Sequence, residues 1–370
     1  MFPWRTISGE EASAYYAAGT AQYHINADIM YALRKYVQAT GDELFQRECG
    51  AEMLVETARL WLDLGFYSDA KGGKFCINGV TGPDEYNAVV NNNAYTNLMA
   101  RENLRYAAQV VESLQTAEPG AYNALVRKTT LEPSEVKTWI RAAESMYVPY
   151  DERLQIILQD DNFLDREPWD FCNTPHDHYP LLLFYHPLNI YRKRVIKQAD
   201  VVLAMFLLGD AFPSEMKKRN FDFYDPLTTG DSSLSSCVEA IIAAQIGDID
   251  KAFCYGMAAL LMDLADVGGN VKDGCHIASM GGTWMMLTYG FGGMRDDDGT
   301  LSFWPRRAPE ENAVLRFPVT YRGQLLEVEI GLDEVKYALR EGERLVIRHE
   351  TQEVELTREN PVTVRPVSRR

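Results

Sequence analysis

The strongest constraint on the fold of this chain is an apolar spacing of three and four residues that recurs from about Ala21 to Phe291. That spacing puts apolar side chains on one face of a helix. It begins with Ile25, Ile29 and Leu33, and predicts further helices at Ala94–Leu114, Pro133–Met146, Tyr191–Leu208, Pro213–Phe223, Leu234–Ile246, Ile249–Leu264 and Thr283–Tyr289. Successive amphipathic helices favour an array of helical hairpins whose loops at one end carry function.

The pattern changes near residue 298, after which apolar and polar residues alternate in short runs separated by glycine-containing turns. Alternation with a period of two is typical of strands with one buried face. The chain is therefore expected to have two domains, a helical one over residues 1–297 and a small antiparallel β-domain over 298–370. Within the first, Gly247 and Asp248 are placed to end one helix and to begin the next.

Composition excludes several classes of function. The net charge of −16 argues against binding to duplex nucleic acid. The longest apolar stretch, near Phe253–Met262, is too short to cross a bilayer, and the N-terminal residues lack the pattern of a secretory signal. The six cysteines are scattered without a CxxC pair, which favours reduced thiols over disulfides. A cytoplasmic protein is expected.

Cofactor motifs are weak. The chain has neither a Walker loop nor a Rossmann glycine fingerprint, so no nucleotide cofactor is implied. His176, His178 and His186 suggest a metal, but prolines interrupt the segment and no further spaced ligands accompany it. No metal and no cofactor are expected.

Three long polar loops interrupt the predicted helices, and such loops are commonly functional. In the first, VTGPDEYNAVVNNN, the Gly-Pro turn could project Glu85 from a rigid backbone, or its acids could cap the helix near Ala94. Lys197, placed on a predicted helix, could be a ligand or a surface cation. Ser232 and Ser233 could bind an anion at a helix start or serve only as caps. By itself His276 is more typical of a packed histidine than of a ligand.

The same loops resemble a known family. The segments VTGPDEYNAVVNNNAYTNLMARENLRYAA, AGTAQYHINADIMYALRKYV, HPLNIYRKRVIKQADVVLAMFL, DPLTTGDSSLSS and GCHIASMGGTWMMLTYGFGG are similar to the glycoside hydrolase family 65 phosphorylases, which act on trehalose, maltose, kojibiose and related α-glucosides. The resemblance extends over about Phe2 to Gly293. It implies an (α/α)6 barrel followed by a small β-domain.

The resemblance also implies roles for particular residues. Glu85 would protonate the glycosidic oxygen, with Asp84 as the next candidate. Lys197 and Gln198 would bind the transferred glucosyl unit. Inorganic phosphate, a substrate rather than a cofactor, would be held by Ser232, Ser233 and His276. The reaction would be an inverting phosphorolysis of an α-linked disaccharide to β-glucose 1-phosphate and glucose, and the segment AGTAQYHINADI favours trehalose.

Two different functions also fit the sequence. A trehalase-like hydrolase on the same fold would need a base carboxylate near the phosphate loop, where Asp231 is the candidate. Family members also carry a large N-terminal part before the point that corresponds to Met1, so the barrel is expected to be incomplete at that side. Apolar helix faces would then be exposed, and the chain could be an inactive fragment that serves as a binding or assembly subunit. A homodimer is expected for the full-length parent.

Overall fold

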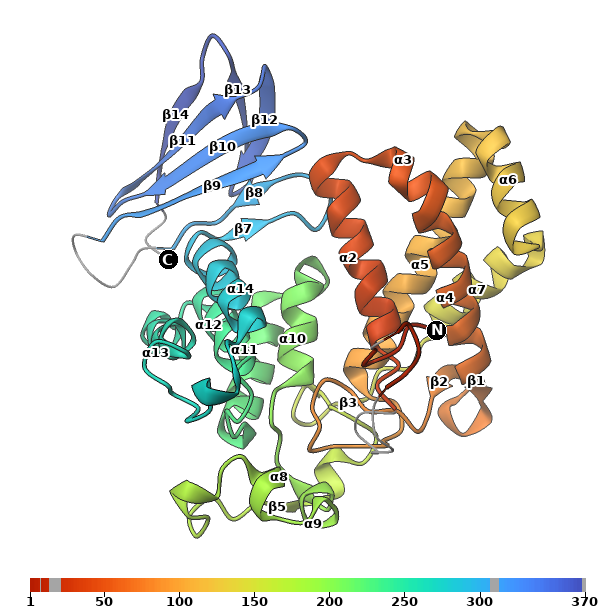
Figure 1. Ribbon diagram of the computed structural model, residues 1–370, viewed down its shortest axis with the longest axis vertical. Helices are drawn as coiled ribbons and strands as arrows, with labels where there is room; N and C mark the ends of the chain where they lie inside the picture. Colours follow the sequence, from red (N-terminus) through yellow and green to blue (C-terminus); the bar gives the residue numbers. More distant parts are fainter. Residues whose placement is uncertain (7, 13–20, 307–312, 368–370) are drawn as a thin grey trace. The chain divides into compact units, whose positions relative to one another are not determined.

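Helices make up most of the chain up to Phe291, and strands make up most of the residues beyond it (Figure 1). The computed structural model describes residues 1–6, 8–12, 21–306 and 313–367. The first three residues of the segment AGTAQYHINADI, 18–20, lie outside the described residues. The chain divides into two compact units: unit 1 comprises Met1–Val37, Asp42–Ala204 and Leu227–Thr229, and unit 2 comprises Gln38–Gly41, Met205–Pro226 and Gly230–Arg370. The predicted boundary after residue 297 stays a prediction.

Unit 1 begins with helices that pack through their apolar faces. They are α2 (Ile25–Thr40), whose residues from Gln38 on belong to unit 2, α3 (Glu43–Phe45), α4 (Ala51–Leu64), α5 (Ala94–Ala117), α6 (Pro119–Thr129) and α7 (Pro133–Ser145), with a π-helical turn at Gln46–Gly50 and a hairpin of β1 (Gly65–Ser68) and β2 (Lys74–Ile77). Trp61 and Trp139 are fully buried between them. The Trp61 indole N–H donates to Asn103 Oδ1 at 2.9 Å, so this large core side chain leaves no polar atom unsatisfied.

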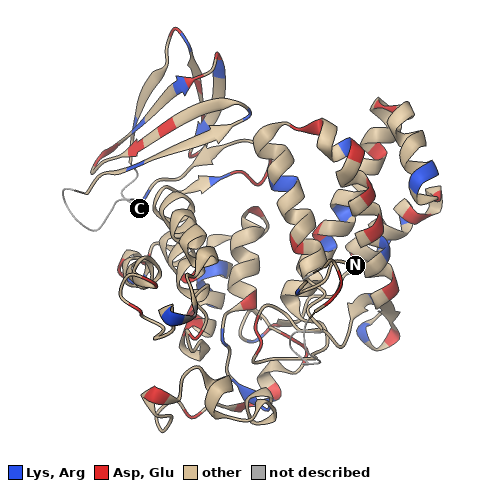
Figure 2. Cartoon of the chain, in the orientation of Figure 1, with Lys and Arg blue, Asp and Glu red and all other residues tan. Residues whose placement is uncertain are grey.

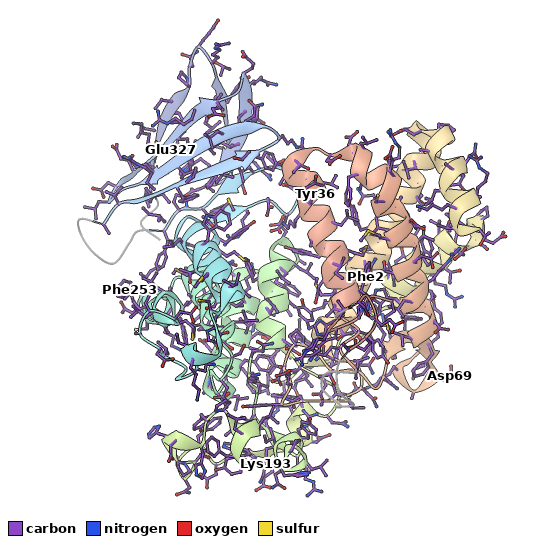
Figure 3. The ribbon with its side chains drawn as sticks, viewed as in Figure 1. Phe2, Tyr36, Asp69, Lys193, Phe253 and Glu327 are labelled. Carbon is purple, nitrogen blue, oxygen red and sulfur yellow. The ribbon has the colours of Figure 1, made fainter. Side chains whose placement is uncertain are left out.

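The second part of unit 1 is irregular. It holds the short strands β3 (Tyr150–Asp151), β4 (Ile156–Ile157), β5 (Glu167–Pro168) and β6 (Lys193–Arg194), the helices α8 (Leu181–Phe184) and α9 (Pro187–Tyr191), and α10 (Asp200–Leu207), whose residues from Met205 on belong to unit 2. Lys193, labelled in Figure 3, pairs with Glu167 at 2.6 Å where β6 runs parallel to β5. A small apolar core of Tyr86, Leu181, Ile190 and Val195 holds this part together.

The predicted helix at Tyr191–Leu208 is wrong in its first half, and Lys197 therefore does not lie on a helix. Residues 192–199 are extended or bent, and α10 begins only at Asp200. The backbone N–H of Ile196 donates to Leu227 O at 3.1 Å, and the Ile196 carbonyl accepts from Thr229 N–H at 2.9 Å. Because these backbone groups already bond to another segment, the helical hydrogen-bond pattern cannot form here.

The helices of unit 2 are α11 (Ser214–Tyr224), α12 (Ser235–Ile246), α13 (Ile249–Leu261) and α14 (Ile277–Met285), the last continuing into a π-helical turn at Met286–Phe291. The predicted helix end at Gly247 is confirmed, since Gly247 has a φ of 88°. The predicted start at Asp248 is also confirmed, because its carboxylate accepts from Lys251 N–H at 3.1 Å. In Figure 2, α14 carries no charged residue.

The strands of unit 2 form two four-stranded sheets, in the orders β14-β11-β10-β9 and β13-β12-β8-β7. They are β7 (Met294–Arg295), β8 (Ser302–Phe303), β9 (Leu315–Tyr321), β10 (Gln324–Ile330), β11 (Glu334–Glu341), β12 (Arg344–His349), β13 (Gln352–Thr357) and β14 (Val362–Pro366). Strands β8 and β12 pair in parallel and the other pairs are antiparallel. Alternate residues such as Val328, Tyr337 and Ile347 are buried in a common core, as the period of two predicts. Among the described residues, no helix is long and apolar enough to cross a membrane.

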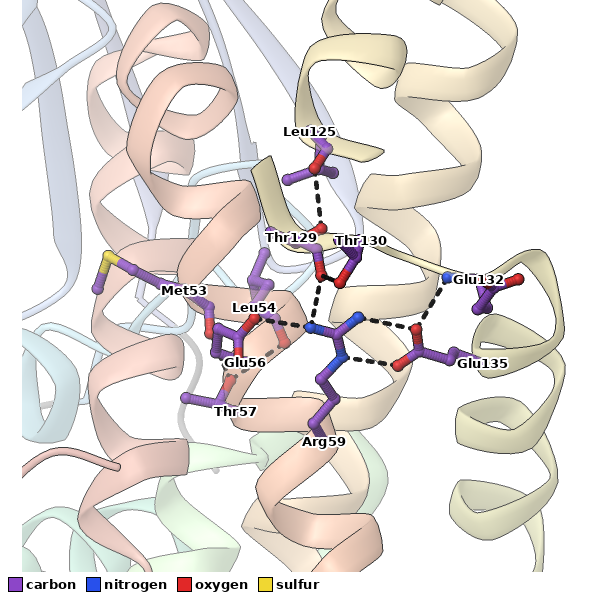
Figure 4. Close-up of polar contacts among 10 residues, drawn as sticks. All are labelled: Met53, Leu54, Glu56, Thr57, Arg59, Leu125, Thr129, Thr130, Glu132 and Glu135. Carbon is purple, nitrogen blue, oxygen red and sulfur yellow. Dashed lines mark hydrogen bonds and ion pairs between the residues drawn. The ribbon is translucent and has the colours of Figure 1, made fainter. Parts of the chain in front are cut away.

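One ion pair links three helices of unit 1 (Figure 4). Arg59 on α4 donates to both oxygens of Glu135 on α7, at 2.7 and 2.8 Å. It also donates to the carbonyl of Thr129, the last residue of α6, at 2.9 Å. Glu135 in turn accepts the backbone N–H of Glu132, which completes the capping box at the start of α7.

Replacing Arg59 with glutamine should therefore destabilise unit 1. The change removes a bidentate, charge-assisted pair that is only partly exposed, and we expect the free energy of unfolding to fall by about 1–3 kcal/mol. Urea unfolding followed by circular dichroism measures this. Arg344→Gln is the control, because the Arg344–Glu355 pair is exposed and should contribute little. Equal unfolding midpoints for the two variants would contradict the prediction.

Candidate active site

The loop that contains Glu85 is closed at its base by two backbone hydrogen bonds. Val80 N–H donates to Val90 O at 3.0 Å, and Val90 N–H donates to Val80 O at 2.8 Å. Inside the loop, the Thr81 hydroxyl accepts from Val89 N–H at 3.0 Å. The residues between are thus held as a tight turn from which one carboxyl can project.

Asp84 anchors this loop from within. Its carboxylate is fully buried and accepts four N–H groups: Tyr86 N at 3.2 Å, Asn87 Nδ2 at 2.5 Å, Gln159 Nε2 at 2.7 Å and Lys197 N at 2.8 Å. Burial raises the pKa of Asp84 to about 6, and these donors oppose the rise because they favour the charged form. With both oxygens occupied by donors, Asp84 is a structural carboxylate.

A second buried carboxyl, Asp200, fixes the other side of the loop. It accepts Asp84 N–H at 2.8 Å and Asn93 Nδ2 at 2.9 Å. Burial and the nearby charge of Asp84 raise the pKa of Asp200 well above its usual range. The approach requires Gly82, since a Cβ there would collide with the Asp200 carboxyl and the Asn93 amide. Glycine at this position lets two polar groups pack directly against the backbone.

Glu85, Lys197 and Gln198 come together in unit 1. Lys197 Nζ donates to Glu85 Oε2 at 2.6 Å, and Gln198 Nε2 donates to the carbonyl of Pro83 at 2.6 Å. The Glu85 and Lys197 side chains are 20% and 24% exposed, so both are partly shielded and still reachable by a ligand. Lys197 is thus a partly buried cation paired with an acid, and its role as a ligand stays a prediction.

Ser232, Ser233 and His276 belong to unit 2. The first two are separated from α12 by Leu234, and the Ser232 hydroxyl accepts from Leu234 N–H at 3.2 Å. His276 directly precedes α14, and its Nδ1 lies 2.6 Å from Asp263 Oδ1. The six candidates therefore fall into two groups, three in each unit.

The helices α12 and α14, which begin beside these candidates, run parallel. Gly282 of α14 packs against Cys237 near the start of α12, and Gly290, about two turns on in the π-helical turn that continues α14, packs against Ile241 and Ala244 further along α12. The N-termini of α12 and α14 therefore lie at the same end of unit 2. Since each N-terminus carries a partial positive charge, this end favours an anion.

Hydrogen bonds show which side chain caps the helix α5 and which groups two of the histidines contact. The helix α5 is capped by Asn93, whose side chain accepts from Thr96 N–H at 2.9 Å, so the acids of the Gly-Pro loop do not cap it. His178 Nδ1 contacts the Tyr185 hydroxyl at 3.1 Å, and His186 Nδ1 accepts from Leu188 N–H at 3.2 Å. Over the part of the chain that the structure describes, no group of three possible metal ligands occurs.

Glu239 on α12 is a buried acid that the sequence did not single out. It is 5% exposed, and burial together with the charge of Asp225 raises its pKa to about 8. Asp225 is held in turn by Lys251 at 2.8 Å. The available signal was a lone carboxylate within the apolar run CVEAIIAA, and such a residue in a helix core is unusual.

Comparisons of the chain with family models and with known proteins all indicate the same family. Residues 1–285 match the model of the glycosyl hydrolase family 65 central catalytic domain, and residues 294–356 match the model of the C-terminal domain of that family. The chain is 48% identical over 364 residues to an α,α-trehalose phosphorylase of Geobacillus stearothermophilus, covering 98% of this chain and 47% of that protein. It is 50% identical over 347 residues to the α,α-trehalose phosphorylase of Thermoanaerobacter brockii, covering 94% of this chain and 45% of that protein.

A solved structure provisionally assigned as a kojibiose phosphorylase from the human microbiome superposes with a TM-score of 0.88 at 29% identity, covering 99% of this chain and 50% of the other. This likeness confirms the predicted fold class, a mainly helical barrel fold followed by a small β-domain. The chain spans about half the length of the curated relatives it matches.

The role of Asp84 can be tested with Asp84→Asn. An asparagine keeps the shape but turns one oxygen into a donor, so about two of the four N–H groups lose their acceptor, at a cost of about 2–4 kcal/mol. We expect a lower urea midpoint and faster hydrogen exchange in residues 81–87 and 195–200. Asp69→Asn, at an exposed position labelled in Figure 3, is the control and should leave both unchanged. Exchange in Asp84→Asn as slow as in the control would show that the carboxylate does not hold the loop.

Proposed function

Because the chain belongs to glycosyl hydrolase family 65, we propose that it carries the site of an inverting disaccharide phosphorylase. The reaction converts an α-linked glucose disaccharide and inorganic phosphate to β-glucose 1-phosphate and glucose. The observation that carries the proposal is the Glu85–Lys197 pair, a carboxyl and a cation held next to each other by a buried hydrogen-bond network.

In this proposal Glu85 is the general acid, which gives its proton to the glycosidic oxygen as the bond to the anomeric carbon breaks. Lys197 and Gln198 donate to hydroxyls of the transferred glucosyl unit. The short segment from Lys197 to Asp200 supports this role, since it is tied to Asp84 at both ends, by the backbone N–H of Lys197 and by the carboxylate of Asp200. A fixed acid and fixed sugar donors are what proton transfer to a leaving oxygen requires.

Phosphate is the nucleophile, and Ser232, Ser233 and His276 are proposed to hold it. Two parallel helix N-termini support this assignment, because they add N–H groups and partial positive charge to the hydroxyl donors. Asp263 engages Nδ1 of His276 and leaves Nε2 as the nitrogen that can face the ligand. Phosphate is already anionic, so the new bond to the anomeric carbon forms without a base, and the configuration inverts.

Trehalose is the proposed substrate. The two curated relatives at 48% and 50% identity are α,α-trehalose phosphorylases, which supports trehalose over other α-glucosides. A homodimer for the longer parent enzyme and a cytoplasmic location stay predictions.

The reaction class is tested by supplying trehalose to the purified chain with and without phosphate. Phosphorolysis predicts β-glucose 1-phosphate and one equivalent of glucose, only when phosphate is present. Glucose release at the same rate in both samples, without a sugar phosphate, would support the trehalase-like hydrolase with Asp231 as base. Trehalose unchanged in both samples would support the inactive binding subunit and contradict the proposal.

The general acid is tested by Glu85→Gln, which keeps the shape of the side chain and removes the transferable proton. Turnover of trehalose should fall on the order of a thousandfold or more. Glucosyl fluoride of matching anomeric form should be partly spared, since fluoride leaves without full protonation. Near-normal turnover of trehalose would overturn the assignment.

The contrasting variant is the double substitution Ser232→Ala and Ser233→Ala. It removes hydroxyl donors from the proposed anion site, so it should raise the KM for phosphate while the acid remains in place. Loss of turnover at saturating phosphate, with the KM unchanged, would argue that these serines act elsewhere.

A further inference from the structure

Unit 2 contains a cavity of about 500 Å³ that the proposed function does not use. It is formed by the start of α11, the C-terminal end of α12 and the strand region around β7 and β8. The proposed phosphate residues Ser232 and Ser233 precede the opposite end of α12, which is 12 residues long, or about 18 Å at 1.5 Å per residue. The cavity is therefore separate from those residues, and its volume is in the range of small-molecule sites.

Lys217 is a buried cation at this cavity. It is 8% exposed, and its Nζ donates to Gln245 Oε1 at 2.9 Å. Within the described residues it forms no ion pair with a carboxylate, although Asp210 and Asp297 are near enough to raise its pKa. Burial and the charge of Arg295 outweigh them and lower the pKa of Lys217 to about 8. An ammonium group in this setting is costly unless a ligand compensates it.

Two further side chains at the same cavity have N–H groups that can donate to a ligand. The guanidinium of Arg295 donates to the backbone carbonyls of Tyr289 and Met294, and within the described residues it too lacks an ion pair. Burial lowers its pKa to about 10. Gln245 Nε2 is buried without a hydrogen-bond partner among the described residues, while its Oε1 holds Lys217. A buried unsatisfied amide beside one buried cation, Lys217, and one partly buried cation, Arg295, points to a missing acceptor.

The C-terminus of a helix carries a partial negative charge, which a nearby cation can neutralise. At the end of α12 this role explains only part of the arrangement. Arg306 neutralises that charge directly, because its Nη2 donates to the carbonyl of Gln245 at 3.0 Å. Lys217 instead bonds the Gln245 side chain, and Arg295 bonds carbonyls outside α12. Asp297 is near enough to raise the pKa of both cations, but burial has the larger effect and lowers the pKa of each.

We propose that this cavity binds a phosphate group, either free or as part of a small phosphate monoester. The phosphate oxygens would accept from Lys217, Arg295 and Gln245 Nε2. Asp210 and Glu350, which line the same cavity, could accept from hydroxyls of the organic part, and the partly exposed ring of Trp304 offers it an apolar face. A buried lysine, a partly buried arginine and an unsatisfied amide favour a dianion, and both kinds of ligand carry one.

The proposal is tested on the purified chain by acetylating lysines and measuring the modification of each site by peptide mass spectrometry. Millimolar glucose 6-phosphate, inorganic phosphate and glucose are added separately. We expect the phosphate-bearing ligands to protect Lys217, and glucose to leave it unprotected. Lys218, the exposed neighbour that pairs with Asp222, is an internal control and should react equally in every sample. Protection by glucose 6-phosphate alone would identify a monoester, and equal protection by phosphate would identify the free ion.

Calorimetry with two variants completes the test. Lys217→Met should weaken binding by about tenfold or more, because it removes a charge-assisted hydrogen bond, whereas Lys218→Met should not change it. Lys217→Met should melt no lower than the parent chain without ligand, since it removes a buried charge. The double variant Ser232→Ala and Ser233→Ala should leave Lys217 protection intact, which separates this site from the proposed active site. Loss of protection in that double variant, equal protection by glucose, or no protection by any ligand would overturn the proposal.

Discussion

The buried carboxylate of Asp84 holds together segments of unit 1 that are far apart in the sequence. Its four donors come from the same loop, from Gln159 and from the backbone of Lys197, and Asp200 binds the loop from the other side. An ionised carboxyl loses its hydration when it is buried, so the charge is stable only while all these donors remain in place. A displacement of any one segment would leave a charged oxygen or a buried N–H unsatisfied. The loop that contains Glu85 and the segment that contains Lys197 therefore hold each other in place, and neither can move without disturbing the other.

This constraint explains both the geometry and the error at Lys197. The apolar residues Val195, Ile196, Val201 and Val202 have a spacing that suits a helix, and the spacing alone predicts one. A helix would need the backbone groups of Ile196 and Lys197 for its own hydrogen bonds. The Leu227–Thr229 segment bonds those of Ile196 instead, and Asp84 accepts the N–H of Lys197. Those bonds join residues 30 or more positions apart, and local periodicity contains no information about them. The result brings the ammonium of Lys197 onto the Glu85 carboxylate, which a regular helix would not guarantee.

Features that depend on neighbouring residues could be predicted, and features that depend on distant ones could not. The helix end at Gly247 and the start at Asp248 follow from local backbone and capping chemistry, and strands such as β9 and β10 follow from apolar residues at every second position. The helix α6 was missed because it begins with Pro119–Gly120, a pair typical of a turn, and the start of α14 at Ile277 was missed because Gly281 and Gly282 interrupt its pattern. For the site, the residue types and the family resemblance identified the candidates. The roles of Asp84 and Asp200 depend on burial, and a carboxyl in a polar loop gives no sign of it.

Burial also separates charged residues that the sequence presents as equivalent. Lys217 and Lys218 are adjacent in a polar run, yet one is 8% exposed and the other pairs with Asp222 at the surface. Asp84 and Lys217 are both buried, but Asp84 is surrounded by protein donors while Lys217 has one neutral acceptor. A buried charge whose partners are all supplied by the chain stabilises the fold. A buried charge that lacks them lowers stability, and its presence next to a cavity is best explained by a ligand that supplies the missing partner. A buried charged side chain that stabilises the fold therefore differs from one that binds a ligand less in how deeply it is buried than in whether the chain supplies all its hydrogen-bond partners.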